Sequence, residues 1–189
     1  FSPIANAESG TGVIESMRAI CPEGVIVLSQ ATWPITGYLT LQGFDADTGL
    51  LPQGDYSMDI DAFSLWEGKR QGTFDEAYRT YHRVLGAGYP VSAIGSSNTF
   101  GTYMQETGYP RVYIKSSTDD PAEVSAEELA ENIKRRLVSV TNGPFIKYTV
   151  NGRDPGSLIT DTDGNVEVQI EVYAPDWARV TSIAINRNG

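Results

Sequence analysis

The amino-acid sequence predicts an α/β domain followed by a β-rich extension. Up to residue 143, segments with helical spacing of apolar residues alternate with short β-branched runs, which is typical of a parallel sheet covered by crossover helices. After Pro144, apolar and polar residues alternate with the period of two that is typical of strands. We therefore expect an α/β domain over residues 1–143 and a β-sandwich-like extension over residues 144–189.

Three helix-and-strand units account for the first part. Residues 11–20 have apolar side chains at helical spacing and precede the strand-like run VIVLS. The second unit contains the strand-like DAFSLW, a helix that begins at TFDE with capping-box spacing, and the strand-like YPVSAIGSS. The third contains RVYIK, the helix-like SAEELAENIKRRL with a second capping box, and LVSVTNG. We expect the strands of all three units to lie parallel.

Two regions fall outside this pattern. Residues 31–59 form a long connection rich in Gly, Pro and aromatic residues, and structureless connections of that length are uncommon unless they cover a site. The extension consists of FIKYTVNG, NVEVQIEVYA and RVTSIAINRNG, which predict three strands. Because three strands rarely complete a sandwich, and because the chain begins without methionine, we expect a fragment or a processed form of a longer protein.

Composition excludes some classes of function. The chain has 189 residues, of which 40% are hydrophobic, enough for one good core. A formal charge of −10 and a pI near 4.5 argue against binding to a nucleic-acid backbone, which requires clustered Lys and Arg. No apolar stretch approaches the ~20 residues of a membrane span. The single cysteine, Cys21, is predicted to be a buried structural thiol rather than a nucleophile.

Polar residues follow the first three expected strands. Because ligands bind at the carboxyl ends of parallel strands, these residues are the best candidate site. They are Ser29, Gln30, Trp66, Glu67, Ser97 and Asn98. Polar residues also mark the ends of many strands that bind nothing, so that interpretation stays open.

Catalytic residue types are scarce in this chain. The only histidine, His82, falls within an expected helix, where a surface or half-buried side chain is more usual than a catalytic one. One histidine can build neither a multi-histidine metal cluster nor a Ser-His-Asp triad. The strand-to-loop stretch AIGSSNTFG ends in hydroxyls, an amide and a phenyl ring.

The order of several motifs resembles a known family. VIVLSQATWP, GYLTLQGFD, DAFSLWEGKR, VLGAGYPVSAIGSSNTFG, GYPRVYI and SVTNGPFI are similar to the later half of the polymerase and histidinol phosphatase (PHP) superfamily. The branch that they resemble is that of the carbaryl-hydrolase-like metallohydrolases. The resemblance implies the later half of a distorted β/α barrel, with metal ions at the carboxyl ends of its strands and hydrolysis of phosphoesters or carbamates.

The metal motifs of that family are altered here. Where members read Asn-His-Pro this chain reads SQA, so that Gln30 stands at a metal-binding histidine position. Where members read Ser-Asp-Thr-His it reads SNTF, so that Asn98 replaces an aspartate and Phe100 a histidine. An amide is a weak, uncharged ligand and a phenyl ring is none. We therefore expect that the chain keeps the PHP-like scaffold but has no metal ligand, no metal cofactor and no catalytic residue.

Our first hypothesis is therefore a PHP-like domain that has lost its metal site and binds a small polar ligand at the old active-site face. Hydrogen bonds would come from Ser29, Gln30, Ser97 and Asn98. A stacking surface would come from Trp33 or Trp66.

Two alternatives stay open. An active hydrolase would take zinc, manganese or iron on ligands in an amino-terminal half, with Arg111 or Asn142 contacting an anionic substrate, because a guanidinium grips phosphate in a bidentate manner. Arg111 could instead be a surface salt-bridge partner. The other alternative is an interaction module whose β-rich tail meets its partner. A secreted or periplasmic location is compatible with the acidic balance, the low lysine use and the unpaired cysteine.

Overall fold

The structure is a computed structural model with mixed α/β architecture. It describes residues 10–34, 37–45, 47–48, 57–68, 71–103, 106–160 and 164–186. Its helices are α1 (Gly10–Ile20), α2 (Tyr38–Leu41), α3 (Gln71–Gly86) and α4 (Ala126–Lys134). Its strands are β1 (Val27–Leu28), β2 (Ala62–Glu67), β3 (Ser92–Ser96), β4 (Arg111–Ile114), β5 (Val138–Thr141), β6 (Phe145–Val150) and β7 (Val168–Tyr173). These strands form three separate sheets and close no barrel among the described residues.

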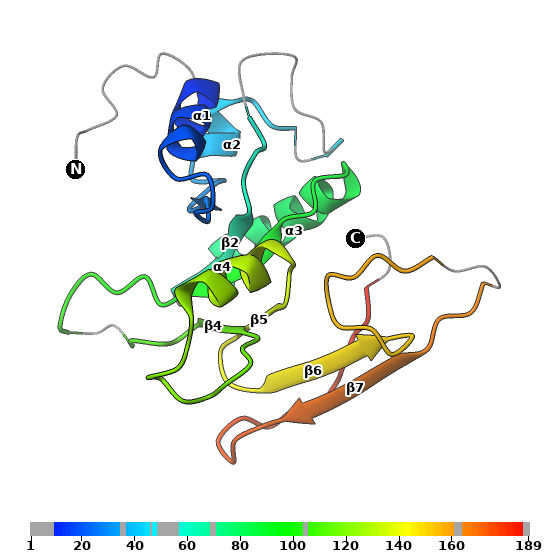
Figure 1. The fold of residues 1–189 in the computed structure, drawn as a ribbon. Helices are drawn as coiled ribbons and strands as arrows, with labels where there is room; N and C mark the ends of the chain where they lie inside the picture. The colour runs from blue at the N-terminus through cyan, green and yellow to red at the C-terminus, as the bar shows by residue number, and fades with distance from the viewer. Residues whose placement is uncertain are drawn as a thin grey trace.

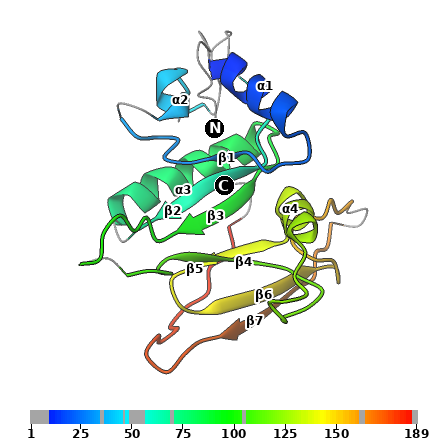
Figure 2. The same ribbon diagram turned by 60° about the vertical axis from the view of Figure 1, so that its left-hand side comes forward.

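The first two units form the expected parallel sheet, with the order β1-β2-β3. Helix α3 connects β2 to β3 and lies along this sheet, while α1 and α2 lie near β1 (Figures 1 and 2). The buried core joins these layers through Leu39 of α2, Phe63 of β2 and Val84 of α3. The parallel arrangement predicted from alternating strands and helices is therefore confirmed for these three strands.

The third unit is not parallel, which corrects our prediction. Strands β4 and β5 are antiparallel, with Arg111 opposite Thr141. The amide of Asn132 in α4 donates to the carbonyl of Lys115, which directly follows β4, and the Lys115 amide donates to Leu137, which precedes β5. Helix α4 thus remains beside the end of β4. Strand β5 therefore starts at that end and runs back along β4 in the opposite direction. The predicted cap of α4 is confirmed, because Ser125 Oγ accepts from the amide of Glu128 at 3.2 Å.

The β-rich extension contains one hairpin in place of the three expected strands. Strands β6 and β7 pair antiparallel, with Phe145 opposite Tyr173. Residues 180–186 form no strand, and Ile183 and Ile185 are exposed. Their alternating pattern predicted a strand wrongly, because a strand also needs a partner strand, and among the described residues none pairs with this segment. The side chain of Asn186 contacts the hydroxyl of Tyr78 on α3 instead.

The long connection over residues 31–59 has structure of its own, because its described part contains α2, and Leu39 of that helix is buried in the core. Residues 35–36, 46 and 49–56 of this connection lie outside the described residues. Cys21 is exposed rather than buried, because it lies just past the end of α1, in a turn where the amide of Gly24 donates to its carbonyl.

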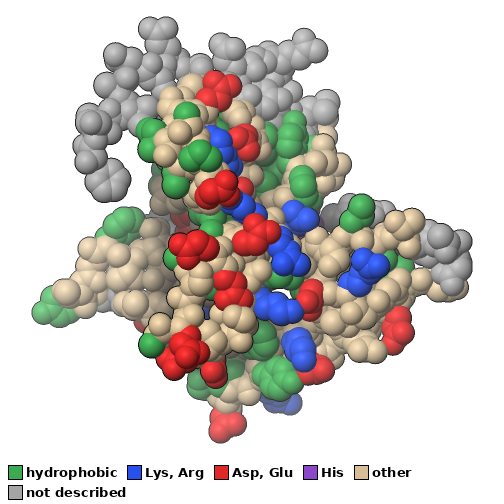
Figure 3. All heavy atoms as spheres, viewed as in Figure 1, with side chains coloured by type: hydrophobic (Ala, Val, Ile, Leu, Met, Phe, Trp, Pro, Cys, Tyr) green, Lys and Arg blue, Asp and Glu red, His purple; other side chains and the backbone are tan. Residues whose placement is uncertain are grey.

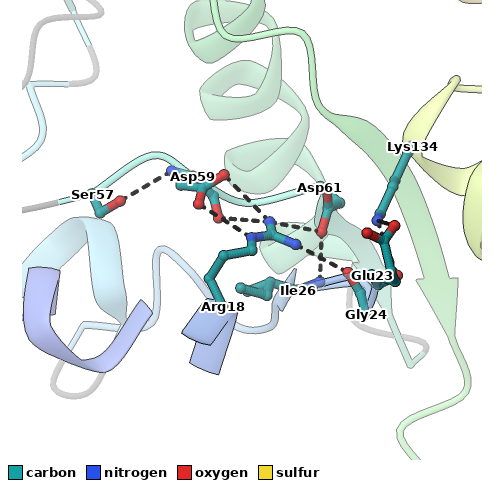
Figure 4. A network of polar contacts seen from close by, with 8 residues as sticks. All are labelled: Arg18, Glu23, Gly24, Ile26, Ser57, Asp59, Asp61 and Lys134. Carbon is teal, nitrogen blue, oxygen red and sulfur yellow. Dashed lines mark hydrogen bonds and ion pairs between the residues drawn. The ribbon is translucent and has the colours of Figure 1, made fainter. Parts of the chain in front are cut away.

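Arg18 ties α1 to the start of β1 and β2 (Figure 4). Its guanidinium donates to the carboxylates of Asp59 and Asp61 and to the carbonyl of Gly24. Asp61 also accepts from the amide of Ile26, immediately before β1, at 2.8 Å. The Arg18 and Asp61 side chains are only 21% and 14% exposed, so the network is partly shielded from water. It fixes the amino-terminal edge of the parallel sheet.

Replacing Arg18 by methionine should lower the free energy of unfolding by about 1–3 kcal/mol, because the half-buried carboxylate of Asp61 loses its cationic partner. Chemical denaturation monitored by circular dichroism measures the change. The matched control is Lys147→Met. Lys147 is 62% exposed and 4.0 Å from Glu171, so we expect a loss below about 1 kcal/mol there. Equal losses in the two variants would contradict the structural role of Arg18.

Candidate functional site at the carboxyl edge of the parallel sheet

The ends of β1 and β2 are joined by one carboxylate. Ser29 and Gln30 follow β1, and Glu67 is the last residue of β2. The Ser29 hydroxyl donates to Glu67 Oε1 at 2.7 Å, and the backbone amide of Gln30 donates to the same oxygen at 3.1 Å. Glu67 therefore fixes the turn that leaves β1.

The ends of β2 and β3 also lie side by side. The Gly68 amide donates to the carbonyl of Ser96 at 2.9 Å. A Cβ atom on Gly68 would lie 3.5 Å from the carbonyl oxygen of Ser97 and 3.6 Å from Cβ of Asn98. The hydroxyl of Thr99 donates to that of Ser97 at 3.0 Å. The three strand ends thus form one continuous polar row, which consists of Ser29, Gln30, Glu67, Gly68, Ser97 and Asn98.

The predicted convergence of these residues is present, with one important addition. Sequence reasoning gave Glu67 no role beyond its place at a strand end, whereas in the structure it is the centre of the row. The register of β2 with β3 shifts between Ser64 and Trp66, and a shift of this kind re-aims the side chains that follow it. The only signal in the sequence was a carboxylate directly before a glycine at the end of an apolar run.

The two candidate stacking residues differ. The ring of Trp66 packs on that of Phe74 in α3, with centroids 4.5 Å apart, so one surface of the indole is already occupied. Trp33 lies in the turn after β1, where its amide donates to the carbonyl of Gln30, and its side chain is exposed. Trp33 is therefore the better placed of the two to cover a ligand at the row.

Gln30 and Asn98 share an unusual backbone conformation. Each is the second residue past its strand, and each has a φ of 49°. Asparagine tolerates the left-handed region, but for glutamine it costs about 1–2 kcal/mol. Strained residues of this kind are frequent at functional sites, but Arg136 and Asn151 also have positive φ away from the row. The conformation is therefore compatible with a functional role for the turn after β1 and does not assign one.

The donor groups at the row do not fit the catalytic metal centre that the family resemblance implies. Glu67 is the only carboxylate of the row, and one of its oxygens already accepts two hydrogen bonds. Phe100, at a histidine position of the family, is 82% exposed and offers no ligand atom. Among the residues that the structure describes, no three His, Cys, Asp or Glu side chains are grouped so that they could hold a metal ion.

Arg111 and Asn142 belong to the β4–β5 pair and not to the polar row. Arg111 begins β4 and is paired with Thr141 of β5, and Asn142 follows Thr141 directly. Asn142 donates to the hydroxyl of Tyr109 at 3.3 Å. In the described part of the chain Arg111 makes no ion pair with a carboxylate, so the alternative of a surface salt bridge finds no support there.

His82 lies on α3, half-buried, as its place in the sequence predicts. Its ring makes an edge contact with Tyr78, with centroids 4.4 Å apart, and a second with Tyr81. Burial lowers the pKa of His82 below its ordinary value. The contacts are those of a packing residue on the helix.

The lowered pKa of His82 makes a prediction about acid stability. The unfolded chain binds a proton at His82 at higher pH than the folded chain does. The contribution of the neutral His82 to the free energy of unfolding is therefore complete above the ordinary histidine pKa of about 6.5, and it declines as the pH falls below that value. Between about pH 7 and pH 5, we expect the thermal midpoint of unfolding to fall less in His82→Gln than in the parent. Thermal unfolding across this range tests the prediction, and parallel curves for the two proteins would contradict it.

Comparison with known proteins leaves the residues themselves as the basis for a function. No protein-family model, no curated protein and no solved structure matches this chain.

Two surface features bear on partners. None of the helices in the described ranges is both long and apolar enough to cross a membrane. On the face shown in Figure 3, Lys and Arg side chains lie among Asp and Glu side chains rather than apart from them, and described ion pairs include Lys115 with Asp154 and Lys134 with Glu23. This mixing gives no sign of the clustered basic surface that nucleic acid requires.

Proposed function

We propose that this chain is a PHP-like domain that binds a small polar ligand along the polar row without a catalytic metal. The observation that carries the proposal is the hydrogen-bonded junction of Glu67 with Ser29 and Gln30, which brings the end of β1 to the end of β2. A site that gathers polar groups from several parallel strands at their carboxyl ends is the usual place for a ligand in an α/β protein.

The row favours a ligand that carries hydroxyl groups. Glu67 Oε2 accepts no hydrogen bond from the described residues, and an ionised carboxylate can only accept, so the ligand must donate there. The Ser97 hydroxyl accepts from Thr99 and keeps its own proton to donate. The amide of Asn98 can do both. Donors and acceptors that alternate over a short distance suit a polyol or a sugar.

The PHP-like part of the proposal is supported by where the altered positions lie. Gln30 and Asn98 stand where the resemblance places metal ligands, and both occupy the second position past a parallel strand with the same φ. A hydrolase of this type would have kept charged or imidazole ligands there. The later half of a distorted β/α barrel, the secreted or periplasmic location and the β-rich partner surface remain predictions from the sequence.

Isothermal titration with myo-inositol, a neutral polyol, tests the ligand-binding role. We expect saturable binding by the parent and at least about tenfold weaker binding by Glu67→Gln, because the amide that replaces one carboxylate oxygen no longer accepts from the ligand and removes the charge that strengthens these hydrogen bonds. Glu131→Gln, an exposed position on α4, is the matched control and should bind as the parent does. Absence of binding, or equal weakening in both variants, would overturn the polyol assignment.

A further inference from the structure

The side chain of Arg111 is fixed in one direction at the start of β4. Its Nη1 donates to the carbonyl of Gly108 at 3.2 Å. Its Cζ atom lies 5.8 Å from the centroid of the Tyr113 ring, a cation–π distance. The ring of Tyr113 in turn meets that of Phe145 of β6 at 5.2 Å. The guanidinium is thus held by a carbonyl on one side and an aromatic face on the other.

One edge of this guanidinium has no partner in the described part of the chain. Its Nε is buried and makes no hydrogen bond there, and Nη2 donates to no described residue either. A buried donor of a charged group is costly to leave unsatisfied, and such a group in a native structure calls for an explanation such as a bound ion. Nε and Nη2 together form the edge that grips two oxygens of a carboxylate or phosphate.

The surroundings suit an anion. Among the described residues no Asp or Glu forms an ion pair with Arg111, so its charge is uncompensated there in a chain with a net charge of −10. Asn142 follows Thr141, the register partner of Arg111, but its side chain donates to the hydroxyl of Tyr109, so the guanidinium carries the argument alone.

We propose that Arg111 binds a compact oxyanion, a phosphate or carboxylate group, through Nε and Nη2. This site lies on the β4–β5 sheet and is separate from the polar row. It does not depend on what the row binds. An anion there would satisfy the buried Nε and neutralise the guanidinium at once.

The Nε–H signal of Arg111 in NMR spectra tests this proposal, with inorganic phosphate and acetate as probes in separate titrations. We expect saturable movement of this signal with at least one probe, and the stronger response identifies whether a tetrahedral or a planar oxyanion is preferred. The affinity should fall at least about tenfold in Arg111→Lys, which keeps the charge but not the two-pronged edge. Arg153→Lys, at an exposed position, should bind as the parent does.

Three results would overturn the proposal. The Nε–H signal could stay unchanged at saturating phosphate and acetate, as expected if only water satisfies it. The probes could move other signals alone, or Arg111→Lys could bind as tightly as the parent. Circular dichroism and the myo-inositol titration of the same variant show whether the fold and the polar row are intact, so failure here is distinguishable from failure of the proposed function.

Discussion

Replacing Phe63 by alanine is expected to lower the free energy of unfolding by about 3–5 kcal/mol. Phe63 lies in β2 and is completely buried, in a core that it shares with Leu39 of α2 and Val84 of α3. Its ring centroid is 6.0 Å from that of Tyr81. The alanine variant loses the burial of the ring and also leaves a cavity between layers that cannot fully close.

Phe100 provides a matched control for this change, because the same side chain is removed at a position that is 82% exposed. Phe100→Ala should change the free energy of unfolding by less than about 0.5 kcal/mol. Chemical denaturation of both variants measures the difference. Similar losses in the two would mean that β2 does not lie at the centre of the core.

Replacing Gly95 by alanine should cost about 1–3 kcal/mol, because β3 is packed tightly against the β4–β5 pair. A Cβ atom at Gly95 would lie 2.7 Å from Cγ1 of Val140 and 2.9 Å from the carbonyl oxygen of Arg111. The valine side chain could rotate, but the carbonyl belongs to the backbone of β4 and can move only with its strand. We therefore also expect altered amide signals at Arg111 in NMR spectra of this variant.

Gly86 at the end of α3 is the control, since a Cβ atom there meets nothing within 4 Å and its φ is not positive. Gly86→Ala should leave the free energy of unfolding unchanged or raise it by up to about 1 kcal/mol, because alanine restricts the unfolded chain. If Gly95→Ala were as stable as Gly86→Ala, the close approach of β3 to β4 would be wrong.

Local pattern predicted the parts of the fold in which each strand is followed by a crossover helix. The order β1, β2, α3, β3 follows from the helical period, and its parallel register is as expected. The start of α3 was predicted wrongly, because the helix begins at Gln71, two residues before the TFDE motif that was expected to cap it. The third unit has the same local pattern, yet β5 runs antiparallel because Asn132 holds α4 at the end of β4. That hydrogen bond joins residues whose meeting depends on tertiary structure, so periodicity could not reveal it.

The candidate site was predictable in its members but not in its centre. Strand ends indicated Ser29, Gln30, Ser97 and Asn98, because their place follows from the period of the strands. The role of Glu67 depends on a register shift in β2, which leaves no clear mark on the alternation of residues. That Nε of Arg111 lacks a partner in the described residues depends likewise on the packing around one atom, which periodicity cannot predict. The residue type alone had already suggested an anion.

Whether Gln30, Asn98 and Phe100 stand at the positions of a lost metal site can be tested without knowing the ligand. The decisive variant combines Gln30→His, Asn98→Asp and Phe100→His, and zinc binding is measured by isothermal titration. Its control places the same changes elsewhere, as Gln42→His, Asn151→Asp and Tyr103→His, with Asn151 also at a φ of 49° and Tyr103 also exposed.

If these positions form a strand-end metal site, one carboxylate and two imidazoles placed there should create zinc affinity, because the number and charge of the ligands dominate metal binding. We expect the first variant to bind one zinc ion at least about tenfold more tightly than the control variant and the parent, the smallest gain typical of a restored metal environment. If the folded variant binds zinc no better than its control, these positions do not converge and the PHP-like assignment is wrong.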